Sequence, residues 1–414
     1  MIPIKLQLTI MQFLQFFVWG AWLITIGNYC TETQGWSFKE FGAVFSTLGI
    51  ASIIMPALMG IMADRWMNVE RLYGLLHLIY AGIFFYLPNV TDPSTFFWVV
   101  LAGMFCYMPT LSLSNSIAYT VLTNAKMDVV KVFPPIRVWG TVGFILAMWT
   151  TNLTGSKADA NMFYISAIAA ACLGIYAFTL PKCPPLRSQT EKSTVAGILG
   201  LKAFSLFANY KMALFFIFSM FLGAALQLTN MYGDTYLSSF ANYPEYADSL
   251  VVKRSTIIMS ISQISETLFI LAIPFFLKRF GIKKVMLMSM FAWVLRFGLF
   301  AYGDPASNLW MIIGSCIIYG MAFDFFNISG SLFVETTTTA TMRSSAQGLF
   351  MMMTNGFGAI LGSAVSGWVI ESFYKLPDGN NDWQGIWLGF ALYALIVAIL
   401  FAVLFKHKNE LVVQ

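Results

Sequence analysis

Charged side chains are scarce in this 414-residue sequence: Asp, Glu, Lys and Arg together make up only 10% of it. Soluble domains contain roughly a quarter of such residues, so the classes of protein that need a water-soluble surface are excluded. Hydrophobic residues make up 58% and aromatic residues 16%. Apolar runs of about 18 or more residues recur, each long enough to cross the ~30 Å hydrocarbon core of a bilayer. We therefore expect the lipid bilayer to surround most of the chain.

Patterns that signal metal binding or catalysis are also missing. The five cysteines are scattered, with no CxxC motif and no pairing with either of the two histidines. The apolar runs contain no Ser/His, His/Asp or metal-ligand constellation. We therefore expect neither an enzyme nor a bound cofactor, and nucleic acid is not an expected partner.

Windows of apolar residues bounded by charge, Gly and Pro predict twelve membrane-spanning helices. The predicted spans are residues 6–29, 41–63, 71–88, 95–122, 136–152, 162–181, 210–234, 255–277, 284–302, 308–333, 344–373 and 385–405. The longest polar stretch, residues 182–209, separates the first six spans from the last six. The predicted fold is an all-α membrane protein with two pseudo-symmetric six-helix halves, residues 1–181 and 210–414, joined by a cytoplasmic linker.

The basic residues determine the expected orientation. With the N-terminus inside, eighteen of the 24 Lys and Arg lie in the termini and cytoplasmic loops, and one, Arg296, lies within a span. The five on the other side are Lys39, Lys157, Lys253, Arg254 and Lys375. Because Lys and Arg are enriched in cytoplasmic loops, we expect both termini in the cytoplasm and a multi-pass chain in the bacterial cytoplasmic (inner) membrane. The net charge of +5 then reflects topology rather than an acidic ligand.

Two loops about half a chain apart carry related motifs. Gly60-Ile-Met-Ala-Asp-Arg65 follows the second span, and Phe276-Leu-Lys-Arg-Phe-Gly281 follows the eighth. They resemble the loop signature of the major facilitator superfamily, although Met67 replaces an expected Gly in the first motif and the second lacks the Asp. Members of this superfamily have two six-helix halves with the substrate site near the bilayer midplane, and we expect the same organisation here.

Few ionisable side chains lie inside the predicted spans. Each needs a reason, because an ionised group at a helix centre costs at least ~2.5 kcal/mol. Glu266 lies in the eighth span, Asp324 in the tenth and Arg296 in the ninth, while Arg137 opens the fifth. Glu266 has two interpretations, either a structural ion pair with Arg296 or Arg137, or a direct part in transport.

Helical spacing places the other polar and aromatic candidates on shared faces. The groups that share a face are Gln227 with Asn230, Gln263 with Glu266, Tyr319 with Phe323, and Arg137 with Thr141 and Phe144. Amides also join helices in membranes, and rings often only pack, so each group has a structural interpretation as well. One polar stripe per helix is what a central cavity needs. This set suits a neutral, polyhydroxylated molecule with a flat ring, and a sugar fits nearly as well as a nucleoside.

Four strings around these residues are long and unusual. They are Phe133 to Phe144, Gln227 to Met231, Ser260 to Phe269 and Ala322 to Gly330. Through them, and over nearly the whole chain, the sequence resembles the nucleoside:proton symporter family of the major facilitator superfamily. The resemblance implies import of nucleosides with protons by alternating access, driven by the proton gradient, and we expect a monomer to suffice. The alternative is a proton-coupled sugar or oligosaccharide symporter of the same fold.

The resemblance also implies which residues form the site. The implied substrate-binding residues are Arg137, Thr141, Phe144, Gln227, Asn230, Gln263, Glu266, Tyr319 and Phe323. The family's seventh helix has an acidic residue two positions before its Gln, where this chain has Ala225. Proton coupling is therefore expected of Glu266 and Asp324.

Overall fold

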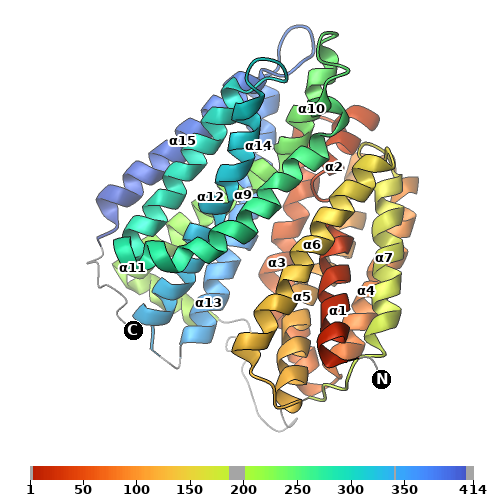
Figure 1. The fold of residues 1–414 in the computed structure, drawn as a ribbon, viewed down its shortest axis with the longest axis vertical. Coiled ribbons are helices and arrows are strands. Elements are labelled where there is room, and N and C mark those ends of the chain that lie inside the picture. Colours follow the sequence, from red (N-terminus) through yellow and green to blue (C-terminus); the bar gives the residue numbers. More distant parts are fainter. Residues whose placement is uncertain (1–2, 186–200, 340–341, 407–414) are drawn as a thin grey trace. The chain divides into compact units, whose positions relative to one another are not determined.

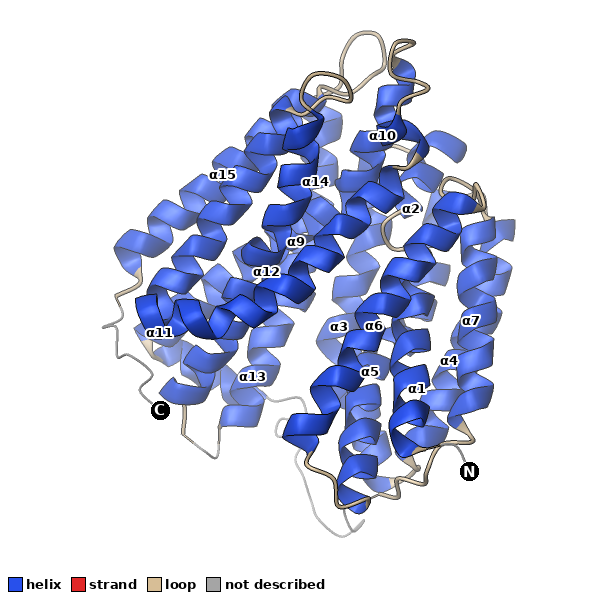
Figure 2. Ribbon diagram, viewed as in Figure 1, coloured by secondary structure: helices blue, strands red, loops and turns tan. Residues whose placement is uncertain are grey.

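The computed structural model describes residues 3–185, 201–339 and 342–406. All the regular secondary structure in these ranges is helical (Figure 2). The described residues form two compact units, one containing residues 3–36 and 47–185, the other 37–46 and the residues from 201 onward. Residues 186–200 of the predicted linker lie outside the described ranges, and its last part forms the short helix η3 (Leu201–Ala208).

The first unit is a bundle of long helices that run side by side (Figure 1). Its helices are α1 (Ile4–Gly20), α2 (Ile26–Asn28), η1 (Tyr29–Thr33), α3 (Phe38–Arg65) from Thr47 onward, α4 (Val69–Tyr86), η2 (Leu87–Asn89), α5 (Pro93–Asn124), α6 (Val129–Leu153) and α7 (Asn161–Ala177). Helix α1 packs against α6, and α4 packs against both α5 and α7. Buried apolar side chains of α1, α4, α5 and α7, such as Leu8, Tyr73, Ile117 and Leu173, form its core.

A buried polar network joins three helices of this core. The Gln15 amide in α1 donates to Thr110 Oγ1 in α5 at 2.9 Å and accepts from the Tyr73 hydroxyl in α4 at 2.5 Å. The Tyr107 hydroxyl donates to the Gln15 carbonyl at 2.7 Å. Because burying an unpaired polar group is costly, these mutual bonds allow an amide to sit in an apolar bundle.

Small residues let α1 and α6 approach closely. A Cβ at Gly20 would collide with the backbone of Phe144, and one at Gly143 would collide with the backbone of Phe13. Glycine is therefore needed at both contact points, as at many helix crossings in membranes. This contact fixes the face of α6 that carries three of the expected site residues.

The second unit contains the remaining long helices (Figure 1). They are α9 (Tyr210–Ser239), η4 (Phe240–Asn242), α10 (Leu250–Lys253), α11 (Ser255–Tyr302), α12 (Leu309–Thr337), α13 (Arg343–Met351), η5 (Met352–Gly358), α14 (Ala359–Phe373) and α15 (Trp383–Leu404). Helix α11 packs against α12 and α15, and α9 packs against η5 and α14. A Cβ at Gly223 of α9 would collide with the backbone of Thr354, so this crossing is also very close.

The described helices cover all twelve predicted spans, with three local differences. Helix α11 contains both the eighth and the ninth span, and the chain turns at Gly281, whose φ of 75° favours glycine. The eleventh span is divided into α13, the π-helix η5 and α14, and the first span is interrupted between Gly20 and Ile26. A π-helical segment widens the hydrogen-bond ladder locally, which apolar periodicity does not reveal.

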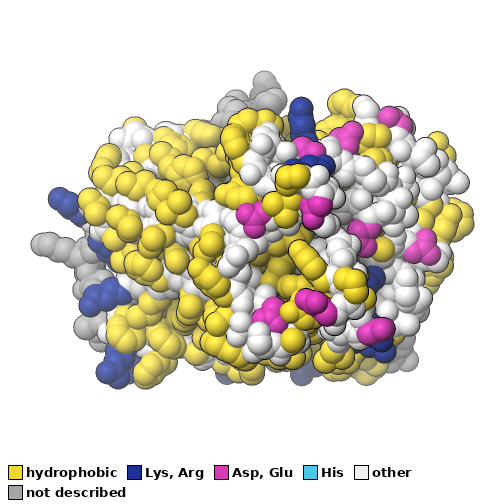
Figure 3. All heavy atoms as spheres, turned by 90° about the horizontal axis from the view of Figure 1, so that it is seen from above, with side chains coloured by type: hydrophobic (Ala, Val, Ile, Leu, Met, Phe, Trp, Pro, Cys, Tyr) yellow, Lys and Arg dark blue, Asp and Glu magenta, His cyan; other side chains and the backbone are white. Residues whose placement is uncertain are grey.

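Figure 3 shows Asp and Glu side chains among apolar and other side chains on one face. Exposed Asp residues in the connections between helices include Asp92, Asp159 and Asp248. Asp92 caps α5: the backbone N–H and the hydroxyl of Thr95 both donate to its carboxylate at 2.8 Å. These hydrogen bonds hold the pKa of Asp92 below its usual range.

Candidate functional site

The expected site residues of the first unit lie on α6 beside α1. The Arg137 guanidinium carbon lies 4.0 Å from the centroid of the Phe16 ring, in cation–π geometry. Phe144 is buried and meets Trp19 edge to face, with centroids 6.3 Å apart. Thr141 is half-buried between them on the same helix. The i, i+4, i+7 stripe expected from the sequence therefore follows one helix face, flanked by aromatic side chains of α1.

In the second unit an aromatic platform lies on α12. The rings of Tyr319 and Phe323 are stacked with centroids 5.9 Å apart and 15° between their planes. Trp293 of α11 meets Tyr319 edge to face at 6.0 Å. Phe323 is half-buried whereas Tyr319 is buried, so the partly accessible ring is the one that a flat ligand can cover.

The buried guanidinium of Arg296 packs against the Tyr319 ring of this platform. Its guanidinium carbon lies 4.7 Å from the centroid of the Tyr319 ring, and the side chain is fully buried. It donates to Thr229 Oγ1 of α9 at 3.3 Å, to Ser262 Oγ of α11 at 3.4 Å and to the Ser315 carbonyl of α12. These hydrogen bonds of the guanidinium all go to neutral oxygens. Whether Glu266 forms a structural ion pair with Arg296 or Arg137 stays a prediction.

The two expected carboxylates belong to neighbouring helices. Helix α12 approaches α11 at Gly320, where a Cβ would lie 2.6 Å from the Ser265 carbonyl oxygen and 2.8 Å from the Glu266 nitrogen. This contact brings Glu266 and Asp324 within electrostatic range of each other and of Tyr319. Asp324 is only 2% exposed, and one of its carboxylate oxygens has no hydrogen-bond partner among the described residues. Burying a charged carboxylate is costly unless its oxygens are hydrogen-bonded.

One of the three expected amides retains unused hydrogen-bonding capacity. Gln227 and Asn230 lie one turn apart on α9, and Asn230 is half-buried. The side-chain oxygen of Gln263 on α11 is buried and has no partner among the described residues. Since buried polar atoms are normally paired, an amide oxygen of this kind is available to a ligand or to water.

Sequence reasoning missed the residues that support this site. Thr229, Ser262 and Ser315 are ordinary small polar residues in apolar helices, and only the position of Arg296 shows why they matter. A fully buried carboxylate, Asp234 of α9, also escaped notice because it lies at the predicted end of the seventh span. It accepts a hydrogen bond from Thr256 Oγ1 at 3.0 Å.

The described residues form long apolar helices in two units, with polar side chains inside the helices, as in a membrane transporter of the major facilitator fold. The chain belongs to the nucleoside H+ symporter family, whose profile matches residues 2–410. It is 52% identical over 408 residues to the xanthosine permease of Escherichia coli K12, covering 98% of this chain and 97% of the relative. It is also 52% identical over 407 residues to the E. coli nucleoside permease NupG, with the same coverage. The crystal structure of the nucleoside transporter NupG matches with a TM-score of 0.91, over 98% of this chain and 100% of that one.

Proposed function

We propose that this protein imports nucleosides together with protons across the bacterial cytoplasmic membrane by alternating access. The observation that carries the proposal is the combination found in the second unit. A stacked aromatic pair, the Gln263 amide with a buried oxygen that has no hydrogen-bond partner among the described residues, and two interacting carboxyl groups occur in a member of the nucleoside H+ symporter family.

Each part of a nucleoside has a counterpart in this set. The base stacks on the half-buried Phe323, because a base on an aromatic ring contributes about 1–3 kcal/mol. The amides of Gln227, Asn230 and Gln263 pair with base edges or ribose hydroxyls, which need both donors and acceptors. In the first unit, the substrate-binding residues implied by the family resemblance are Arg137, Thr141 and Phe144.

The proton resides on the carboxyl pair. Glu266 and Asp324 are close enough to interact, so holding both as carboxylates in a buried site is unfavourable. One proton shared by the pair removes that cost, and its loss on the cytoplasmic side restores the charge. The seventh helix has Ala225 where the family motif has an acidic residue, so no third carboxylate takes part there.

Topology and energetics fit this direction of transport. Both termini lie in the cytoplasm, as the positions of Lys and Arg favour, and one chain forms one pathway. Each charge that crosses a potential of 100 mV releases about 2.3 kcal/mol, enough for roughly 50-fold accumulation. The two units then expose the site alternately to the two sides of the membrane.

The test is uptake of radiolabelled uridine, adenosine and xanthosine in cells and vesicles, with and without a proton uncoupler. We expect accumulation that the uncoupler abolishes, and alkalinisation of a weakly buffered medium when nucleoside is added. Uptake that ignores the uncoupler would refute proton coupling. Thermal-shift screening of the purified protein against nucleosides and sugars tests the substrate class, since stabilisation by sugars alone would favour the sugar symporter.

A further inference from the structure

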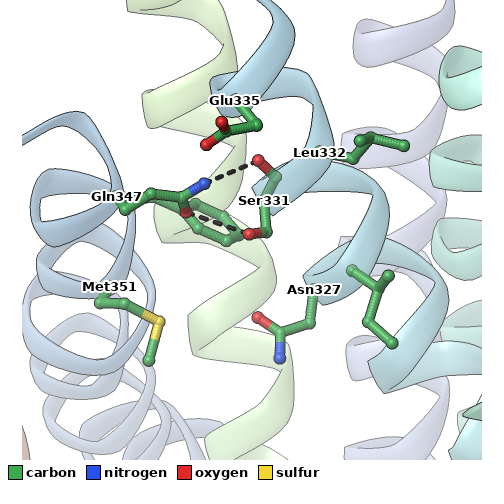
Figure 4. A pocket seen from close by; sticks show the side chains of 8 residues that line it. Asn327, Ser331, Leu332, Glu335, Gln347 and Met351 are labelled. Carbon is green, nitrogen blue, oxygen red and sulfur yellow. Dashed lines mark hydrogen bonds between the residues drawn. The ribbon is translucent and has the colours of Figure 1, made fainter. Parts of the chain in front are cut away.

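A pocket of about 480 Å³ lies in the second unit between α12 and α13 (Figure 4). Its lining residues are Asn327, Ile328, Ser331, Leu332, Glu335, Gln347, Phe350 and Met351. Half of them are polar, and none of them belongs to the expected nucleoside or proton site. A pocket with several polar groups and this volume has room for several waters, each of which needs about 30 Å³ and two to four polar partners.

The polar residues of this pocket continue a stripe that begins at Asp324. Asp324, Asn327, Ser331 and Glu335 are three, four and four residues apart on α12, so they share one helix face. The stripe covers about 16 Å of helix at 1.5 Å per residue. It starts at a carboxyl group that is 2% exposed and ends at Glu335, whose side chain is 47% exposed.

Figure 4 shows how these side chains lie: Asn327, Ser331 and Glu335 project from α12 toward the side of Gln347 and Met351. Gln347 Nε2 donates to the Ser331 carbonyl at 2.7 Å, and Ser331 Oγ donates to Gln347 Oε1 at 3.2 Å. The Asn327 amide is bonded to no other lining residue in that view. At the outer end Glu335 pairs with Arg343 at 2.9 Å.

We propose that this pocket is the proton outlet of the transporter, a chain of water molecules along Asn327 and Ser331 that connects Asp324 to the cytoplasmic end at Glu335. The inference rests on the proposed function, because it takes Asp324 as a proton carrier. In the step, the O–H bond of protonated Asp324 breaks, its proton passes to the nearest water, and an equivalent proton leaves the chain at the Glu335 end. Asp324 ends as a carboxylate, and no other residue changes its protonation state.

The mixed polar and apolar lining of this pocket fits a chain of water molecules better than a wholly apolar lining would. Asn327 and Ser331 supply donors and acceptors that hold water at successive turns, while Ile328, Leu332 and Phe350 keep the remaining walls apolar. Intramembrane polar residues in a row mark ion and proton pathways because each is costly unless it has a function. The charges at the mouth, Glu335 and Arg343, compensate each other, so no net charge blocks release.

Two transport modes separate proton release from the rest of the cycle. Net uptake driven by a proton gradient requires Asp324 to lose its proton inside at every turnover. In exchange of labelled for unlabelled nucleoside at equal pH, the loaded site can return while Asp324 keeps its proton. An obstructed outlet therefore slows net uptake and spares exchange.

The variants are Asn327→Leu and Ser331→Val, each of which replaces a polar side chain on one turn of the stripe by a larger apolar one. We expect net uridine uptake to fall about tenfold in each, with exchange within about twofold of wild type, because each variant removes one hydrogen bond to the water chain. Asn327→Ser, which replaces the amide by a hydroxyl and leaves room for water, should retain net uptake. Thr336→Val is the matched control. Thr336 is on the same helix, but its hydroxyl donates to the backbone carbonyls of Leu332 and Phe333, and it does not line the pocket.

The outcomes are distinct. Equal loss of net uptake and exchange, with weaker nucleoside binding by calorimetry, would make the pocket a substrate subsite and overturn the outlet. Net uptake at the wild-type rate in both variants would also overturn it. Wild-type uptake without proton movement would refute the proposed function itself, and that result is obtained before any variant is compared.

Discussion

Replacing Gly320 by Ala tests whether the contact between α11 and α12 sets the geometry of the site. The added Cβ would lie 2.6 Å from the Ser265 carbonyl oxygen and 2.8 Å from the Glu266 nitrogen. Both are backbone atoms, so no side chain can rotate to make room. The helices must separate locally by about 0.8 Å to reach ordinary contact at 3.4 Å.

That displacement acts on function more than on folding. Overpacking of one methyl group costs about 1–3 kcal/mol, which a large helical bundle tolerates. A shift of about 0.8 Å, however, moves Tyr319 and Asp324 away from Glu266, and a misplacement of about 1 Å can lower a rate by about 10²-fold. We therefore expect Gly320→Ala to be inserted and folded but to take up uridine at least about tenfold more slowly.

The assay compares initial uptake rates in vesicles with nucleoside affinity and melting temperature of the purified protein. Gly314→Ala is the matched control: it lies on the same helix, and its Cβ would meet only Leu299 Cδ1, at 3.6 Å. Gly320→Ala protein that takes up uridine at the rate of Gly314→Ala would refute the reasoning, because the site would then tolerate a separation of α11 and α12.

Four further predictions follow from the same structure. Phe323→Ala should raise the dissociation constant for uridine and adenosine about 5- to 150-fold by calorimetry, because a stacked base contributes about 1–3 kcal/mol, and Phe323→Tyr should not; equal affinity in Phe323→Ala would exclude stacking there. Asp324→Asn should abolish the proton-driven accumulation of nucleoside, which reaches up to about 50-fold at 100 mV in wild type, and should retain exchange. Accumulation of labelled nucleoside by Asp324→Asn to the wild-type level would contradict the coupling role. Arg296→Lys keeps the buried charge but cannot form the planar three-partner arrangement, so the protein should lose about 2–3 kcal/mol of stability and bind nucleosides more weakly; an unchanged melting temperature would argue against it. Asp92→Ala should lower the melting temperature at neutral pH, and the difference from wild type should vanish as the pH falls through the lowered pKa of Asp92; a difference that persists in acid would show that the cap does not depend on its charge.

The twelve spans were predictable because a bilayer imposes a length and an apolar composition on every helix that crosses it. Local departures from a continuous α-helix within these spans were not predictable. Gly281 ends one span and begins the next within what is otherwise continuous helix, and the π-helical turn in η5 changes the register without any change in composition. Apolar periodicity reports burial, whereas these features depend on backbone geometry and on contact with a neighbouring helix.

Candidate residues for the site could be chosen from the sequence, but their arrangement could not. Ionisable and amide groups stand out in an apolar chain, so Glu266 and Asp324 were identified from the sequence. The partners of Arg296 were not identified, because hydroxyls and backbone carbonyls can also accept hydrogen bonds from a guanidinium, and these groups are common in every span. Whether the expected residues bind nucleoside and protons stays a prediction until the variants are measured.

The hydrogen bonds of Arg296 have a mechanical consequence. Arg296, in the second half of α11, forms hydrogen bonds to α9, to the first half of α11 and to α12. Breaking any of the guanidinium hydrogen bonds would leave a charged group less well solvated in an apolar interior. During transport these helices are therefore expected to travel as a single stiff block. Bending within the second unit should be concentrated in helices that lack such a fastening, and the divided eleventh span, with its wider π-helical turn, is the natural place for it.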